Sequence, residues 1–187
     1  MTESTPDRDV VDILTSDHHE VLDLIEEMKL TSDPQLLREH ADTIISELVR
    51  HSVAEEMFVY PAMRRHLPDG EHAVAHDIAE HKELEVTMKR LEAVDAATPG
   101  FREVVDQLEA VLRDHVHDEE TEQFPELRAR VPRFDLLQMA AQVELAKQVA
   151  PTRPHPLAPN NKLFHLTVGP GVGLVDRLRD ALTKRNP

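Results

Sequence analysis

Hydrophobic residues recur every three or four positions from about Asp9 to about Ala150, and most of them are Leu, Val, Ala or Met. This spacing places them on one face of an α-helix. The short breaks LTSDP, PDG and ATPG carry helix stop and start signals and divide the pattern into four predicted helices: Asp9–Leu30, Pro34–Leu67, Glu71–Ala97 and Pro99–Val131. Helices with such short connections alternate in direction, so we expect an all-α, up-down-up-down four-helix bundle over residues 9–132.

The chain changes character twice after this bundle. The segment PRFDLLQMAAQVELAKQVA keeps the helical period and predicts an additional helix over residues 133–150. The next stretch, APTRPHPLAPNNK, is rich in proline and predicts an extended linker, and VDRLRDALTKR then predicts a short amphipathic C-terminal helix. We therefore expect a Pro-rich tail over residues 151–187 whose last helix either docks on the bundle or a partner or stays solvated.

A motif at the end of the second predicted helix returns at the end of the fourth. The segments HSVAEEMFVYP (His51–Pro61) and HVHDEETEQFP (His115–Pro125) share a histidine, two glutamates, an aromatic residue and a proline at equal spacing. The preceding helices also match, because SDHHEVL and AEHKELE each contain an acid, a histidine and a glutamate in the same order. The chain is therefore predicted to contain two copies of one helical hairpin, related by an approximate twofold axis.

Helical register selects four of the 12 histidines as facing the interior, because each lies in a stripe of apolar residues spaced three or four apart. Two glutamates lie one turn after a selected histidine and share its face. The other histidines fall on polar faces, near helix ends or in the tail. The inward set is His18, His51, Glu55, His81, His115 and Glu119.

Two buried carboxylates beside four imidazoles indicate a metal centre. A buried carboxylate without a cation costs several kcal/mol, and two metal ions between these side chains remove that cost. Imidazole with carboxylate suits iron, manganese, zinc or copper and disfavours calcium and magnesium. Inward Glu and His in a four-helix bundle are typical of di-iron sites, so we expect two non-haem iron ions, with manganese or zinc as alternatives. The competing interpretation is a bundle whose histidines titrate without metal.

Composition excludes several other classes of function. The 36 Asp and Glu exceed the 21 Lys and Arg, and the resulting net charge of −15 repels nucleic acid and anionic lipid. The absence of cysteine rules out thiolate sites and disulfides. No apolar run approaches the roughly 18 residues of a membrane span. We therefore expect a cytoplasmic protein that acts on a small molecule and binds neither nucleic acid nor membrane.

The motifs resemble the hemerythrin-like family, the HHE cation-binding domains. The resemblance covers about Val10 to Val131 and rests on DHHEVL, HSVAEEMFVYP, AEHKEL and HVHDEETEQFP. It implies a non-haem, carboxylate-bridged di-iron site in an up-down bundle, with O2, H2O2 or NO as the exogenous ligand. The metal ligands that it implies are the same six residues that register selects.

The third predicted helix departs from the oxygen-carrying members of this family, which place a second histidine one turn from the first. Asp77 and Glu85 lie one turn from His81 instead. His76 lies about 140° around the helix from His81 and is a poor substitute without distortion. Glu85 either completes the site or is a solvated surface residue. We expect an open or water-filled position on one iron, which favours redox turnover over oxygen carriage.

Tyr60 is the candidate catalytic residue. It follows Glu55 closely and could hydrogen-bond a bound peroxide, or it could simply pack near the site. Phe124 takes its place in the second copy, so the two metal positions need not be equivalent. Pro61 and Pro125 should kink or end each helix just beyond the site.

These expectations lead to a first hypothesis of a di-iron protein that turns over peroxide, in the manner of a catalase, in stress defence. The alternative is a protein that binds O2 or NO reversibly, or an iron-linked sensor without turnover. Oligomeric state and physiological substrate stay open.

Overall fold

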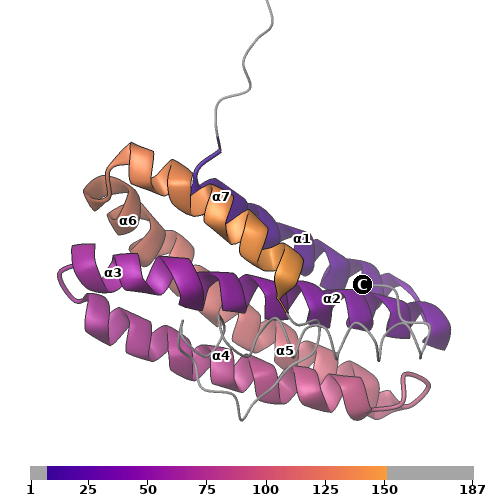
Figure 1. Ribbon diagram of the computed structural model, residues 1–187. Helices are drawn as coiled ribbons and strands as arrows, with labels where there is room; N and C mark the ends of the chain where they lie inside the picture. The colour runs from indigo at the N-terminus through magenta and orange to yellow at the C-terminus, as the bar shows by residue number, and fades with distance from the viewer. Residues whose placement is uncertain (1–7, 151–187) are drawn as a thin grey trace, which may run out of the picture.

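The computed structural model describes residues 8–150, which form a bundle of antiparallel helices (Figure 1). The four rods of the bundle begin as α1 (Val10–Leu30), α2 (Pro34–Ala54), α4 (Gly70–Ala93) and α5 (Pro99–Asp118). Two rods continue beyond a π-helical turn: α2 through η1 (Glu55–Val59) into α3 (Tyr60–His66), and α5 through η2 (Glu119–Gln123) into α6 (Phe124–Arg130). The all-α, up-down-up-down bundle predicted from the sequence is confirmed.

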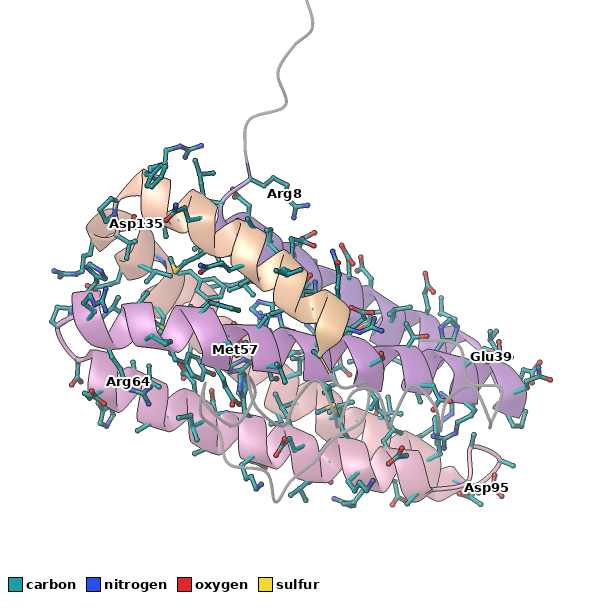
Figure 2. All side chains as sticks on the ribbon, in the orientation of Figure 1. Arg8, Glu39, Met57, Arg64, Asp95 and Asp135 are labelled. Atoms are coloured by element: carbon teal, nitrogen blue, oxygen red, sulfur yellow. The ribbon has the colours of Figure 1, made fainter. Side chains whose placement is uncertain are left out.

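Side chains at the helix ends explain where the rods begin and stop. Asp9 caps α1 by accepting hydrogen bonds from the backbone N–H groups of Val11 and Asp12. Asp33 caps α2 immediately before Pro34 and accepts a hydrogen bond of 2.9 Å from the N–H of Gln35. Charged side chains cover the outside of the bundle, as Figure 2 shows.

The third rod ends at Ala93, earlier than the predicted Ala97. The chain turns at Asp95, whose carbonyl oxygen accepts a hydrogen bond from the N–H of Thr98 at 3.0 Å. The Asp95 carboxylate also accepts one from the N–H of Ala97 at 2.9 Å. This local bonding competes with the helical ladder and ends it.

Both motif prolines lie within continuous helix, directly after a π-helical turn. The N–H of Tyr60 bonds to the carbonyl of Glu55, and the N–H of Phe124 bonds to that of Glu119, each across five residues. In an α-helix a proline ring clashes with the carbonyl four residues earlier, and the wider π turn shifts that carbonyl. The helices therefore do not end at Pro61 or Pro125.

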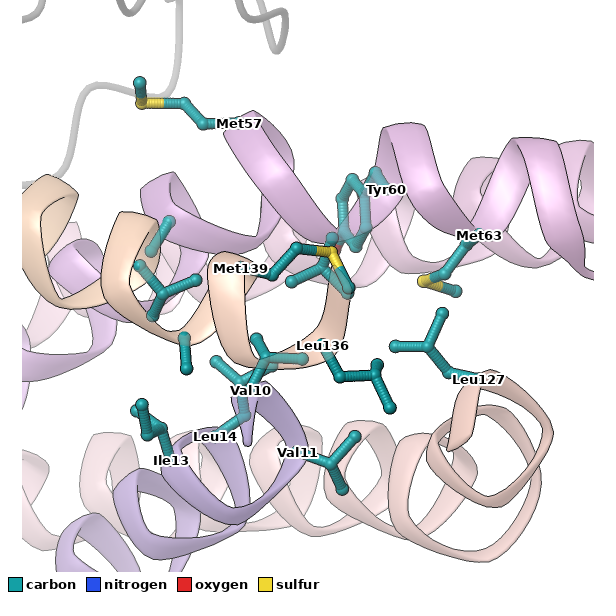
Figure 3. Close-up of a cluster of buried hydrophobic side chains, with 14 of the residues drawn as sticks. Val10, Val11, Ile13, Leu14, Met57, Tyr60, Met63, Leu127, Leu136 and Met139 are labelled. Carbon is teal, nitrogen blue, oxygen red and sulfur yellow. The ribbon is translucent and has the colours of Figure 1, made fainter. Parts of the chain in front are cut away.

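Two apolar clusters fill the bundle on either side of a polar middle. One cluster contains Ile44, Leu84 and Phe101, all 1% exposed or less. The other contains Leu14 and Met63, together with side chains from the last helix (Figure 3). The polar residues selected by register lie between these clusters, so apolar packing fixes their helices at both ends.

The additional helix, α7 (Arg133–Val149), packs along α1 and α2 and covers one hairpin of the bundle (Figure 1). Its inner face buries Leu136, Met139 and Val143. Lys147 on the same helix places its Nζ 2.6 Å from Oδ1 of Asp17 on α1. The linker and short helix predicted for residues 151–187 lie outside the described residues. In the described part of the chain, no helix is both long and apolar enough to cross a membrane.

Candidate metal centre

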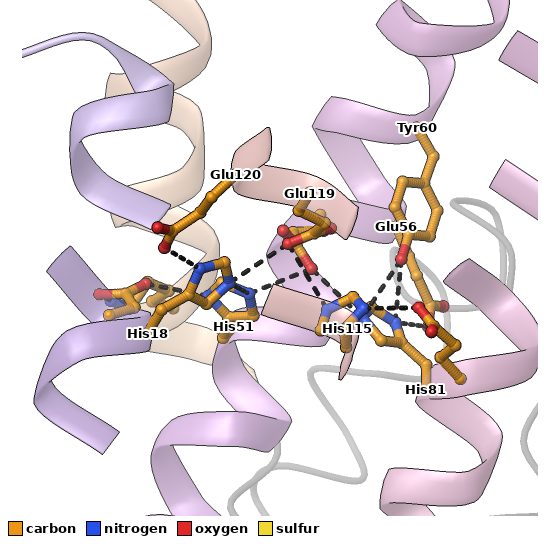
Figure 4. Close-up of polar contacts among 12 residues, drawn as sticks. His18, His51, Glu56, Tyr60, His81, His115, Glu119 and Glu120 are labelled. Atoms are coloured by element: carbon orange, nitrogen blue, oxygen red, sulfur yellow. Dashed lines mark hydrogen bonds and ion pairs between the residues drawn. The ribbon is translucent and has the colours of Figure 1, made fainter. Parts of the chain in front are cut away.

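The four histidines and two glutamates selected by register meet in the middle of the bundle (Figure 4). Each rod supplies one histidine, and each glutamate is the first residue of a π turn. All six side chains are 3% exposed or less. These residues form two groups, and in each group one ligand atom from every residue lies within 4.8 Å of the others. The first group is His18, His51, His115 and Glu119, and the second is Glu55, His81 and His115.

The distances within the cluster suit metal coordination. Nε2 of His18 and Nε2 of His51 are 3.1 Å apart. Two imidazole nitrogens that each lie about 2.1 Å from one metal ion, at a right angle, would be about 3.0 Å apart. The spacing of these two rings therefore matches adjacent positions on a single ion.

The two glutamates lie between histidines of different pairs. Oε2 of Glu55 is 3.2 Å from Nε2 of His51 and 3.3 Å from Nε2 of His81. Oε2 of Glu119 is 3.2 Å from Nε2 of His18 and 3.5 Å from Nε2 of His115. A carboxylate in such a position can bridge two ions.

These buried carboxylates approach imidazoles of the cluster at ion-pair distances, without hydrogen-bond geometry. Neither oxygen of Glu55 and neither oxygen of Glu119 has a hydrogen-bond partner, and Nε2 of His115 is also without one. Unpartnered carboxylates in a protein interior are costly unless a cation neutralises them. The donor set therefore fits metal ions bound by imidazole and carboxylate.

Each of the four histidines also contacts a second carboxylate through its other ring nitrogen. Such a contact fixes the tautomer and orientation of the ring and raises its basicity as a ligand. The Nδ1 contacts are His18 with Glu120 at 2.8 Å, His51 with Asp17 at 3.3 Å, His81 with Glu56 at 3.3 Å, and His115 with Glu80 at 3.0 Å.

Helical register does not single out these four acids, although each is the chain neighbour of one of the six selected residues. The contacts repeat between the two copies of the hairpin. In both copies, the acid before the first histidine contacts the second histidine of the same hairpin. The acid after the glutamate contacts the first histidine of the other hairpin. The duplicated motif thus encodes the outer contacts of the centre as well as the inner ones.

Tyr60 breaks this symmetry. Its hydroxyl lies 3.1 Å from Nδ1 and 3.2 Å from Nε2 of His81, and the side chain is 1% exposed. Phe124, the matching residue, stacks on His18 with ring centroids 5.8 Å apart. Burial and the carboxylate of Glu55 raise the pKa of Tyr60 well above its usual value. Its hydroxyl therefore stays protonated and can donate a hydrogen bond.

Asp77 is buried close enough to the cluster that Glu119, His115 and Glu55 act on its carboxyl group electrostatically. It is 0% exposed, and Nε2 of Gln123 donates a hydrogen bond of 2.7 Å to its Oδ1. Its Oδ2 has no partner. Burial and the charge of Glu119 raise the pKa of Asp77 to about 7. At neutral pH this carboxyl group can therefore hold or release a proton.

The other two candidates near the third rod lie outside the buried groups. Glu85 is partly exposed and pairs with Lys82, with Oε2 and Nζ 3.3 Å apart. His76 is 49% exposed and contacts Glu80 and Asp118 at the surface.

Without bound cations, the cluster pairs imidazolium with carboxylate. Burial lowers the pKa of His51, but the carboxylates of Glu55 and Asp17 outweigh it and raise the pKa to about 10. Burial raises the pKa of Glu55, yet His51 and His81 hold it well below its usual value. Protons thus occupy the positions where metal ions would bind, and metal binding must displace them.

Comparisons with known proteins agree with this geometry. The family model described as Hemerythrin HHE cation binding domain matches residues 9–127. An uncharacterized hemerythrin-like protein of Schizosaccharomyces pombe is 28% identical over 94% of this chain and 87% of its own length. A protein of Nostoc sp. named DNA nickase is 29% identical over 75% of this chain, which spans only 40% of that protein. No solved structure matches the chain significantly.

Proposed function

Because the chain belongs to the hemerythrin HHE cation-binding domain family, we propose that its buried cluster holds two iron ions. The buried carboxylates of Glu55 and Glu119 support this proposal, since no oxygen of either has a hydrogen-bond partner and Oε2 of each faces two imidazoles of the cluster. The residues that would hold the ions are His18, His51, His81, His115, Glu55 and Glu119, and His115 belongs to both groups.

We propose that the protein turns over hydrogen peroxide to water and dioxygen, as part of a defence against oxidative stress. The bound ions would supply the redox chemistry. Tyr60 is the residue that best supports this proposal. Its neutral hydroxyl can donate a hydrogen bond beside His81, which belongs to the group with fewer candidate ligands. Tyr60 can orient an oxygen ligand there. Asp77, with a pKa near neutrality, can hold a proton close to the same group.

Oxygen evolution from peroxide tests this function. Iron-loaded protein should evolve O2 far faster than the same concentration of free iron, and His51→Ala should abolish both iron binding and turnover. Tyr60→Phe should keep two irons and its melting temperature but lose at least about tenfold in rate, since a positioned proton donor contributes about that much or more. An iron-loaded wild type no faster than free iron would contradict the proposed function. A fully active Tyr60→Phe would contradict the role of Tyr60.

A second candidate, a reversible binder or sensor of O2 or NO, is favoured by one contact. Lys147 on α7 binds Asp17, and Asp17 binds Nδ1 of His51, so the cluster connects directly to the helix that precedes the tail. This function predicts a ligand adduct whose optical spectrum reverses when the gas is removed. It also predicts no oxygen evolution from peroxide.

We do not propose that the protein acts on DNA. The name DNA nickase belongs to a Nostoc protein of which this chain spans 40%. The net charge of −15 disfavours contact with a phosphate backbone, so we propose a small molecule as the substrate.

A further inference from the structure

A third cluster of metal-binding side chains lies on the surface of the bundle. His76 and Glu80 are one turn apart on α4, and Asp118 is the last residue of α5. Nε2 of His76 lies 3.3 Å from Oε1 of Glu80 and 3.2 Å from Oδ2 of Asp118. One atom from each residue falls within 4.8 Å of the others, as in the two buried groups. One imidazole and two carboxylates are ligands that manganese, iron(II) and zinc accept.

A surface pocket of about 390 Å³ opens at this cluster. Its lining includes His76 and Asp118 and also three acids, Asp69, Glu122 and Glu126. None of the described residues that line it is Lys or Arg. A concave surface with charges of one sign concentrates counterions and raises their rate of association. The pocket therefore attracts cations to the cluster.

Gln123 gives the pocket an unsatisfied acceptor. This side chain lines the pocket, yet it is only 8% exposed, and its Oε1 has no hydrogen-bond partner. Its amide nitrogen is occupied by Asp77. This oxygen is itself buried, so it is an unsatisfied acceptor beside the pocket and not an exposed ligand within it.

Glu80 connects this cluster to the buried centre. Its Oε1 faces His76, while its Oε2 lies 3.0 Å from Nδ1 of His115. His115 is the residue shared by both buried groups. Glu80 of the surface cluster thus contacts the interior cluster directly, at the imidazole ring of His115.

We propose that His76, Glu80 and Asp118 form a third, surface-exposed site for a divalent transition-metal cation, which captures ions before they enter the buried centre. The proposal that a cation binds here depends only on the surface cluster. The capture role rests on the proposed buried iron centre.

Titration with Mn²⁺ tests the site, because the electron paramagnetic resonance signal of free Mn²⁺ reports how much is unbound. Iron-loaded wild type should bind one further Mn²⁺ per chain. His76→Ala and Asp118→Asn should each weaken this binding at least about tenfold, as expected when a ligand is lost. His72→Ala is the matched control, because His72 is 81% exposed and lines the same pocket without belonging to the cluster. No further Mn²⁺ in the wild type, or equal binding by His76→Ala, overturns the proposal.

A second pair of variants tests the surface site independently of whether the buried centre binds metal. His51→Ala disrupts the buried cluster and should still bind one Mn²⁺ at the surface. The double variant His51→Ala/His76→Ala should lose that ion. Equal Mn²⁺ binding by His51→Ala and the double variant overturns the surface site, whether or not the wild type holds iron inside.

The rate of iron loading tests the capture role. Tyr60 is the only tyrosine and the chain has no tryptophan, so its fluorescence reports the centre directly. After mixing with limiting Fe²⁺, His76→Ala should load at least about tenfold more slowly than the wild type and His72→Ala, because the capture site lacks one of its ligands. The final iron content should be equal. Equal loading rates overturn the capture role.

Discussion

At the scale of single residues, the outer carboxylates decide how firmly each imidazole is held. Glu120 is the simplest to isolate, because it contacts Nδ1 of His18 at 2.8 Å and belongs to neither buried group nor the surface cluster. Its pKa is lowered first by this contact with His18. The carboxylate is therefore ionised at neutral pH, where it orients the ring and strengthens it as a ligand.

Glu120→Gln should therefore weaken metal binding by about 10- to 100-fold while the fold is retained. Competition with a chelator of known affinity measures the change. Glu103→Gln is the control, because Glu103 is exposed on the same rod and belongs neither to the buried groups nor to the lining of the surface pocket. Equal affinities for Glu120→Gln and the wild type would contradict the orienting role.

The sequence predicts the six inner residues of the centre, which make up the two buried groups. It does not predict the contacts of the four outer acids, which approach the Nδ1 atoms of the histidines. Inner residues such as His18 and Glu55 interrupt apolar stripes, so register alone places them in the interior. An outer acid such as Asp17 or Glu120 is a chain neighbour of an inner residue and lies about 100° around its helix. Which histidine it contacts depends on how the helices pack, and register does not give that. The sequence places Asp77 one turn from His81, but its burial depends on how the rods pack.

At the scale of elements, the hydrophobic period and its breaks predicted the four rods but not the π turns within two of them. Proline in a helical pattern indicates a kink or an end. Here the chain adds one residue to a turn before Pro61 and before Pro125, and the helix continues. Both π turns begin at a glutamate of the centre. Each π turn therefore lies where a glutamate side chain extends into the middle of the bundle.

Helix α7 offers a matched pair of leucines for a test of its contribution to stability. Leu136 is 2% exposed against the bundle, whereas Leu145 is 63% exposed. Leu136→Ala should lower the free energy of unfolding by about 2–5 kcal/mol, because it leaves a cavity. Leu145→Ala should change it by no more than about 0.5 kcal/mol. Urea unfolding of the metal-free protein measures both. Equal effects would mean that α7 does not pack on the bundle in solution.

At the scale of the whole molecule, the protonated cluster gives the metal-free protein a specific dependence on pH. The pKa of His51 is raised from 6.5 to about 10 in the folded state. Its pairing therefore stabilises the fold fully below about pH 6.5 and is lost as the pH rises toward 10. The pKa of Glu55 is lowered, so its contribution is present above 4.5 and is lost as the pH falls further.

The stability of the metal-loaded protein should instead increase as the pH rises. Its imidazoles must be neutral to bind metal, so fewer protons compete as the pH rises. The melting temperatures of the loaded and metal-free forms should therefore diverge between pH 6.5 and about pH 9. Calorimetry of both forms across this range measures the difference. A constant difference would show that protons and metal do not compete for these side chains.

The two matching hairpins have a consequence for how such a molecule can diversify. A homodimer of one hairpin would contain every contact of the centre, but its symmetry would force the same residue onto both sides, either two tyrosines or two phenylalanines. Joining the halves in one polypeptide removes that constraint. Tyr60 can then differ from Phe124, and α7 can cover one half alone. Fusion of duplicated halves is thus what allows each metal position to be tuned by mutation without altering its counterpart.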